Sequence, residues 1–185
     1  MKKLMLLVAT ICAAFSVSAQ SLSYEGDISM LKSVFAYDVE YNYDGLQVNG
    51  TELQEFLASM DDKFRAAWGP EIVTFSEAYG KAMPIAINKK NTLDPANAKY
   101  ILVMNLDSLT LGNVSGMFNP FASSKSGGSI ISGHIDILDA ASRESLCVIT
   151  FNEIQGLSNI SDKTRWGLAY YELGKQIKKM VKKAK

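Results

Sequence analysis

The sequence predicts an α+β fold in which helices pack on one face of a mixed, mostly antiparallel sheet of four or more strands. Three stretches support this prediction. Residues 33–43 alternate in an aromatic-rich pattern, residues 100–111 form a long apolar run, and residues 129–156 contain two alternating segments around a polar turn. A period of two marks a strand with one buried face, and a continuous apolar run suits a central strand. Amphipathic segments lie between and after these strands, so their apolar stripes can cover one sheet face.

The N-terminus predicts export. Two lysines follow Met1, residues 4–15 are apolar, and residues 17–19 (VSA) place small side chains at the two positions that a signal peptidase reads. The apolar segment is shorter than the roughly 20 residues that span a membrane. We therefore expect a signal peptide at residues 1–19 with cleavage after Ala19, a single α+β domain at residues 20–185, and a periplasmic or secreted location.

Two amphipathic helices are expected after the first strand. In residues 51–68 large apolar side chains recur every three or four positions, and residues 51–54 (TELQ) fit a capping box. A Gly-Pro pair at 69–70 ends this helix and starts a second, shorter one that ends near Gly80 or before Pro84. Residues 87–98 are mostly polar and are interpreted as a connector.

The C-terminal half predicts a hairpin followed by a closing helix. Its first strand has one apolar face and one polar face, made respectively by Ile131, Gly133, Ile135 and Ile137 and by Ser132, His134 and Asp136. After a turn at 139–144, the second strand places Cys147, Ile149 and Phe151 on one face. Ser161 or Asp162 caps the last helix, and its apolar stripe is Trp166, Ala169, Tyr170, Leu173, Ile177 and Met180 or Val181.

Residues 112–128 (GNVSGMFNPFASSKSGG) form the one long segment without a helix or strand pattern. A loop of this length in a compact domain is usually functional or disordered. As an interaction loop it would offer apolar anchors to a partner, and these are Met117, Phe118 and Phe121. The alternative is a flexible hairpin extension with no binding role, which the composition alone favours.

The hairpin also holds the residues that could carry chemistry. Cys147 is the one cysteine after residue 19, and its place on an apolar strand face indicates core packing rather than a reactive thiol or an intermolecular disulfide. His134 is the only histidine and shares its face with Asp136, so the two could form a titrating pair. A zinc site would need more ligands, and the sequence has no GxSxG elbow and no phosphate-binding glycine motif. We therefore predict no catalytic residue, no metal site and no cofactor.

The charges are unevenly distributed. The chain has 19 basic and 19 acidic residues, yet six lysines fall within residues 175–185 and no acid follows Glu172. The rest of the exported chain has a net charge of about −8, which argues against general nucleic-acid binding. The lysines either attach the helix end to an anionic membrane or polymer surface, or they compensate the C-terminal helix dipole. We favour the second interpretation.

Three segments together resemble a recurrent pattern of exported bacterial domains. They are AKYILVMNLDSLTLG, SGHIDILDAASRESLCVITFNEIQG and DKTRWGLAYYELGKQIKKMV, at residues 98–112, 132–156 and 162–181. The order of an Ala-x-Tyr-Ile-Leu strand, a loop, a Gly-x-Ile-x-Ile-x-Asp strand, a strand ending in Gly and a helix resembles the TolB N-terminal, CsgG and LpoB type of α/β sandwich. The Ser18-Ala19-Gln20 junction is similar to that of many exported Bacteroidetes proteins. The resemblance covers about half of the exported chain and implies an envelope setting, but it carries no catalytic residues.

These observations favour a non-enzymatic exported envelope protein that acts as a binding or assembly-accessory module. Its expected partner is an envelope protein or a cell-wall polymer. The alternative is a small-ligand binder or hydrolase that uses His134 and Asp136.

Overall fold

The computed structural model describes residues 21–32, 36–63, 65–66, 87–88, 90–114 and 126–184. The predicted signal peptide, the predicted second helix and Met117, Phe118 and Phe121 lie outside these ranges. The strands are β1 (Ser21–Gly26), β2 (Ala36–Asn42), β3 (Gln47–Val48), β4 (Thr51–Glu52), β5 (Thr92–Leu93), β6 (Tyr100–Thr110), β7 (Ile130–Asp139) and β8 (Ser145–Gln155). The helices are the 3₁₀ helix η1 (Ile28–Lys32), α1 (Leu53–Ala58) and α4 (Asp162–Lys183).

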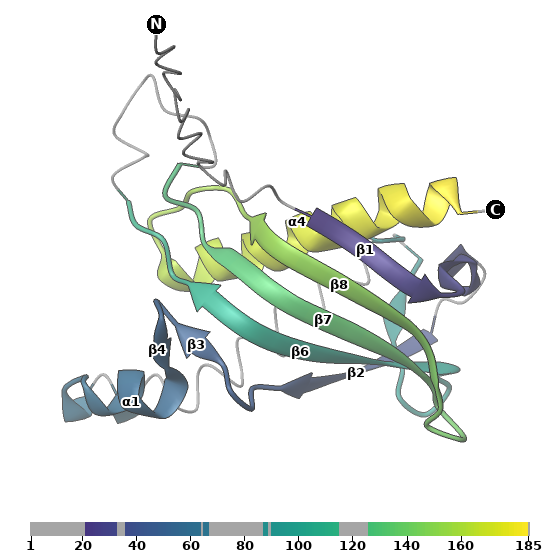
Figure 1. Ribbon diagram of the computed structural model, residues 1–185, viewed down its shortest axis with the longest axis horizontal. Coiled ribbons are helices and arrows are strands. Elements are labelled where there is room, and N and C mark those ends of the chain that lie inside the picture. The colour runs from purple at the N-terminus through teal and green to yellow at the C-terminus, as the bar shows by residue number, and fades with distance from the viewer. Residues whose placement is uncertain are drawn as a thin grey trace, which may run out of the picture.

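The strands form one mixed, mostly antiparallel sheet with α4 across one face, which confirms the predicted α+β class (Figure 1). The main path runs in the order β1-β8-β7-β6-β2-β5. Pairing is antiparallel from β1 to β6, whereas β2 is parallel to both β6 and β5. The short β3 continues beside the end of β6 and pairs with β4. Residues 100–111 were expected to form a central strand, and β6 is paired on both edges.

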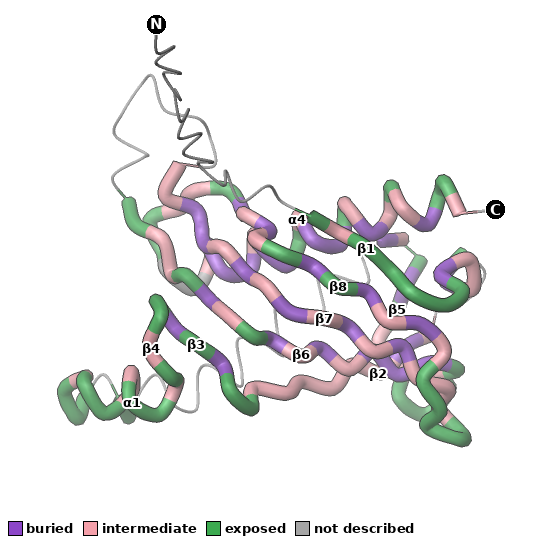
Figure 2. The backbone as a smooth tube through the Cα atoms, viewed as in Figure 1, coloured by how far each residue is buried: buried purple, intermediate pink, exposed green. Residues whose placement is uncertain are grey.

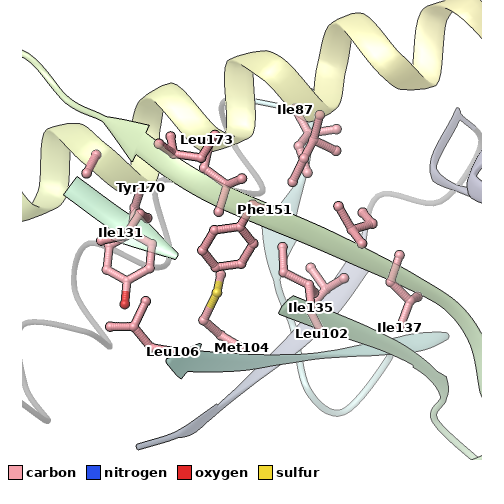
Figure 3. Close-up of a cluster of buried hydrophobic side chains, with 14 of the residues drawn as sticks. Ile87, Leu102, Met104, Leu106, Ile131, Ile135, Ile137, Phe151, Tyr170 and Leu173 are labelled. Atoms are coloured by element: carbon pink, nitrogen blue, oxygen red, sulfur yellow. The ribbon is translucent and has the colours of Figure 1, made fainter. Parts of the chain in front are cut away.

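The core lies between the sheet and α4. Its side chains are those that the strand period of two and the helical spacing of three or four residues predict. Buried and partly buried residues alternate along β7, as Figure 2 shows. From α4 the predicted stripe supplies Trp166, Ala169, Tyr170, Leu173, Ile177 and Val181, all buried. Figure 3 shows the meeting of the two layers, where Phe151 and Met104 of the sheet lie under Leu173 of α4. Within the described chain, no helix is both long and apolar enough to cross a membrane.

The hairpin turn and the cap of α4 are also as predicted. The Asp139 side chain accepts backbone N–H groups from Ala141 and Ser142, both at 2.9 Å, and so fixes the 139–144 turn. Ser161 is the N-cap of α4, and its hydroxyl accepts the N–H of Thr164 at 3.3 Å.

The N-terminal half departs from the prediction. The capping box at residues 51–54 is wrong, because Thr51 and Glu52 form β4 and no side chain caps α1. Helix α1 then ends at Ala58, where the Arg65 side chain bonds the carbonyl oxygens of the last turn. An apolar stripe in the sequence does not reveal such an early helix end, because the apolar residues before and after it still recur every three or four positions. Strands β1 and β5 are also additions that the sequence patterns did not indicate.

Candidate functional site

A network of hydrogen bonds centred on Leu111 holds the start of the 112–128 loop, and we name this network the loop base. The Leu111 N–H donates to Asn49 Oδ1 at 2.9 Å. The Leu111 carbonyl accepts from Ser129 Oγ at 2.8 Å and from Arg165 Nε at 3.2 Å. Asn49 belongs to the β3–β4 turn, Ser129 precedes β7, and Arg165 lies in the first turns of α4. Three elements far apart in sequence therefore fix the residue from which the loop leaves the sheet.

Arg165 is the unusual member of this base, because it is a charged side chain with an exposed fraction of only 2%. Its guanidinium also donates to the carbonyl oxygens of Asn159 and Ile160, in the segment that enters α4. Among the described residues the buried polar or charged side chains are Asn91, Ser129 and Arg165, so two of the three belong to the loop base. Burying a polar group is unfavourable unless it is hydrogen-bonded. Here the hydrogen bonds hold both the start of the loop and the segment that enters α4.

The other end of the loop is held by backbone contacts. Asn113 N donates to the Gly127 carbonyl, and Gly156 N donates to the Ser129 carbonyl, both at 2.9 Å. Gly156 lies directly against α4, where an added methyl group would collide with the backbone nitrogen of Ala169. Only glycine permits this approach. The loop therefore starts and ends at fixed, adjacent points at one end of the sheet (Figure 1).

Exposed apolar side chains gather on the segments that form this base. The exposed fractions are 39% for Val114, 43% for Leu157 and 71% for Ile160. Ile160 precedes the Ser161 cap, where an apolar residue usually packs against one in the first turns of the helix. The corresponding position is Arg165, which turns inward to the loop base, so Ile160 has no apolar residue there to pack against. We name the surface of Val114, Leu157 and Ile160 the loop-base patch.

Sequence reasoning missed Arg165, Ser129 and the loop-base patch. One signal for Arg165 was available, because it lies four residues before Ala169 and eight before Leu173, on the apolar ridge of α4. A pattern that treats arginine as polar cannot use this signal. Leu157 and Ile160 are isolated apolar residues in a polar connector, and nothing in the sequence shows that they lie beside the loop.

The predicted His134–Asp136 pair lies on the sheet face opposite α4, as the alternation required. His134 Nε2 is 3.7 Å from Asp136 Oδ2, and both side chains are about one-third exposed. Asp136 Oδ2 also accepts from Asn105 Nδ2 at 2.9 Å, and Asn105 Oδ1 accepts from Asn42 Nδ2 at 3.0 Å. A polar row thus crosses β2, β6 and β7. The His134–Asp136 separation exceeds hydrogen-bond length, so the pair interacts as charges when the imidazole is protonated.

This row offers little for catalysis. Ser132 shares the face of His134, but its hydroxyl accepts the Glu153 N–H at 2.9 Å and lies 3.2 Å from Asn152 Oδ1. It is therefore occupied rather than poised as a nucleophile. Within the described ranges, no group of three or more His, Cys, Asp or Glu side chains is arranged to hold a metal ion.

Cys147 is a core residue, as predicted. Its exposed fraction is 2%. Burial raises the pKa of the thiol to about 11, and the charge of Asp27 adds to this effect. A thiol with a raised pKa has little thiolate at neutral pH and is a poor nucleophile.

Comparison with known proteins gives distant structural likenesses. No family model matches the chain, and no curated protein matches it. The fold is similar to a PelC dodecamer from Paraburkholderia phytofirmans, with 10% sequence identity and a TM-score of 0.42 over 85% of this chain and 96% of that one. A single-substitution variant of that PelC gives 10% identity and a TM-score of 0.41 over 85% and 97% of the two chains. Neither structure defines a family or an activity for this chain.

Proposed function

We propose that this chain is a non-enzymatic, exported envelope module that binds a partner protein through the 112–128 loop and the loop-base patch. The observation that carries the proposal is the fixation of Leu111 by Asn49, Ser129 and Arg165. These contacts give the loop a defined point of departure from the sheet, which supports a role in presenting its side chains to a partner. The signal-peptide pattern at residues 1–19 supports an envelope location.

A fixed base favours binding for an energetic reason. Association costs the freedom of every segment that it immobilises. Because both ends of the loop are already held, a partner that binds there does not have to immobilise them. Met117, Phe118 and Phe121 are of residue types that are enriched at protein–protein interfaces.

The loop-base patch adds exposed apolar side chains next to the ends of the 112–128 loop. Val114 leads into the loop, and Ile160 belongs to the segment that Arg165 holds. Aliphatic side chains gain most by desolvation against another apolar surface. They therefore favour an envelope protein as the partner over a polar cell-wall polymer, and binding of such a polymer is an outcome of the test.

The test replaces residues 117–126 by a Gly-Ser linker of equal length. The variant should lose a protein that the unaltered chain retains when envelope extracts are crosslinked and purified on it, while its melting temperature changes little. Ile160→Ser and Leu157→Ser should each weaken the same capture. The matched control is Tyr171→Ser, which removes from α4 a large side chain with an exposed fraction of 47%, close to the 43% of Leu157. Unchanged capture by the linker variant would remove the loop from the proposal, and retention of a glycan in place of a protein would change the class of partner.

A second candidate is a small-ligand site or a hydrolase at His134 and Asp136. The Asn42–Asn105–Asp136 row favours it, because it places amide groups and a carboxylate beside the one titratable imidazole. A His134→Ala variant that keeps full activity, in any assay where the unaltered protein shows one, would reject this site.

A further inference from the structure

A groove with an apolar floor and a cationic rim lies at the C-terminal end of α4. Its volume is about 400 Å³, and it is lined by Leu31, Lys32, Ile87, Asn88, Lys178, Val181 and Lys182. Arg165 and Val181 are 16 residues apart on one helix, a distance of about 24 Å at the rise of an α-helix. The groove is therefore remote from the loop base and independent of the function proposed for it.

The floor is built from side chains that face the core. The exposed fractions are 2% for Leu31, 5% for Ile87 and 6% for Val181. Leu31 comes from η1, which packs against α4, and Val181 continues the apolar stripe of α4 itself. These aliphatic groups form the inner surface of the groove, so an apolar chain that enters it removes their remaining surface from water.

The rim is cationic on two sides. Lys178 and Lys182 are one helical turn apart on α4, so their side chains project from the same side of the helix. Lys32 reaches across from η1, where its Nζ donates to the Ala184 carbonyl at 2.6 Å. This hydrogen bond holds the Lys32 ammonium group at the end of α4, and Nζ has further N–H groups for a ligand.

The acids around the rim leave two of these charges uncompensated. Hydrogen bonds from Ser29 lower the pKa of Asp27, and the charge of Lys32 adds to that lowering, so Asp27 partly balances Lys32. Glu172 pairs with Lys175 at 2.8 Å, away from the groove. Among the residues that the structure describes, no carboxylate lies within ion-pair distance of Lys178 or Lys182.

From this arrangement we infer that the groove binds a single-chain fatty carboxylate. The carboxylate lies between Lys178, Lys182 and Lys32, and the alkyl chain lies on Leu31, Ile87 and Val181. Ammonium groups form strong, charge-assisted hydrogen bonds with carboxylates. A volume of about 400 Å³ is near the lower end of small-molecule pockets, roughly 300–1,000 Å³. It suits one alkyl chain rather than a two-chain lipid.

The test is calorimetric titration of chain 20–185 with decanoate below its micelle concentration. The Lys178→Gln/Lys182→Gln double variant should bind decanoate at least about tenfold more weakly. The matched control is Lys179→Gln/Lys183→Gln, which removes the same charge from exposed positions on the same helix turns that do not line the groove. This control should bind within about twofold of the unaltered chain, because exposed charges off the site are screened.

Three results from the titrations with decanoate and phosphate would overturn the inference. They are no decanoate binding by the unaltered chain, an equal loss in the two double variants, and equal binding of decanoate and inorganic phosphate. The second would mean that the whole basic helix end attracts anions, and the third that the apolar floor takes no part. Binding of decanol as tight as that of decanoate would equally reject a role for the lysines.

Discussion

Arg165 and Leu111 lie 54 positions apart in the chain and are joined by a hydrogen bond of 3.2 Å from the guanidinium Nε to the carbonyl oxygen. The bond connects the first turns of α4 to the end of β6, where the sheet stops and the 112–128 loop begins. Because Arg165 also bonds the segment before α4, one buried side chain fixes the helix entry and the loop exit together. Folding stability and loop presentation are therefore coupled at this point.

The first prediction concerns this residue. Arg165→Met keeps much of the side-chain volume but removes the guanidinium donor from the carbonyl groups of Asn159 and Ile160, and it leaves the Leu111 carbonyl with Ser129 Oγ as its donor. We expect the free energy of unfolding to fall by about 2–3 kcal/mol, because partly buried acceptors lose charge-assisted hydrogen bonds. Urea denaturation followed by circular dichroism measures this change.

Arg143→Met is the matched control for that measurement. Arg143 is half exposed and pairs with Glu40 at the surface, so its loss should reduce the free energy of unfolding much less than the loss of Arg165. Equal losses in the two variants would show that the buried position of Arg165 has no special effect on stability.

The second prediction concerns the Glu40–Arg143 pair, which joins β2 to the turn of the hairpin. Arg143 Nη1 and Nη2 donate to the two oxygens of the Glu40 carboxylate, both at 2.9 Å. The hydrogen bond from Arg143, followed by its charge, lowers the pKa of Glu40. A double-mutant cycle with Glu40→Gln and Arg143→Met should give a small favourable coupling free energy near pH 7, because the pair is bidentate but solvent-screened.

The sign of its pH dependence follows from the lowered pKa of Glu40. The coupling should be present above the pKa of an unfolded glutamate, about 4.3, and it should disappear as the pH falls through the folded-state pKa. A coupling that stayed constant down to pH 2 would contradict an ionic origin.

The third prediction concerns the packing of Gly133 in β7. An added methyl group would collide with the backbone carbonyl of Asn105 and press on the Phe151 ring. Gly133→Ala should therefore reduce the free energy of unfolding by about 1–3 kcal/mol, the usual cost of overpacking a core. Ile135→Val, on the same core face, removes one methyl group and should cost about 0.5–1.5 kcal/mol. An unchanged melting temperature for Gly133→Ala would show that β6 does not approach β7 as closely at Gly133 as the structure indicates.

The sheet and α4 could be predicted from the sequence because their signals are local and repetitive. Ile131, Ile135 and Ile137 alternate, and Trp166, Tyr170 and Leu173 recur at the helical period, so the buried face follows from spacing alone. Strand β1 carries no such signal, because it is an edge strand whose residues are mostly exposed. Its position depends on backbone hydrogen bonds to β8, and the sequence of β1 alone does not show this pairing.

The loop base could not be predicted for a similar reason. Asn49, Ser129 and Arg165 are common surface residue types. Their shared role depends on hydrogen bonds to the backbone N–H and carbonyl groups of one residue, Leu111. Such a contact leaves no period, motif or composition in the sequence. The His134–Asp136 proximity could be predicted, since residues i and i+2 of a strand share a face.

The fourth prediction concerns the Cys147 thiol, which burial places in the core with a pKa of about 11. Because the folded-state pKa is above that of an unfolded cysteine, about 8.5, the thiol contributes stability that is complete below pH 8.5 and is lost as the pH rises toward 11. The unaltered chain should therefore lose more stability than Cys147→Ala between pH 8.5 and 11, measured by urea unfolding at each pH. At pH 8 a thiol reagent should modify Cys147 only as fast as the protein unfolds, and added urea should accelerate the reaction in parallel with unfolding. Rapid modification without urea would place the thiol at the surface and reopen the interpretation of Cys147 as a free or bridging cysteine.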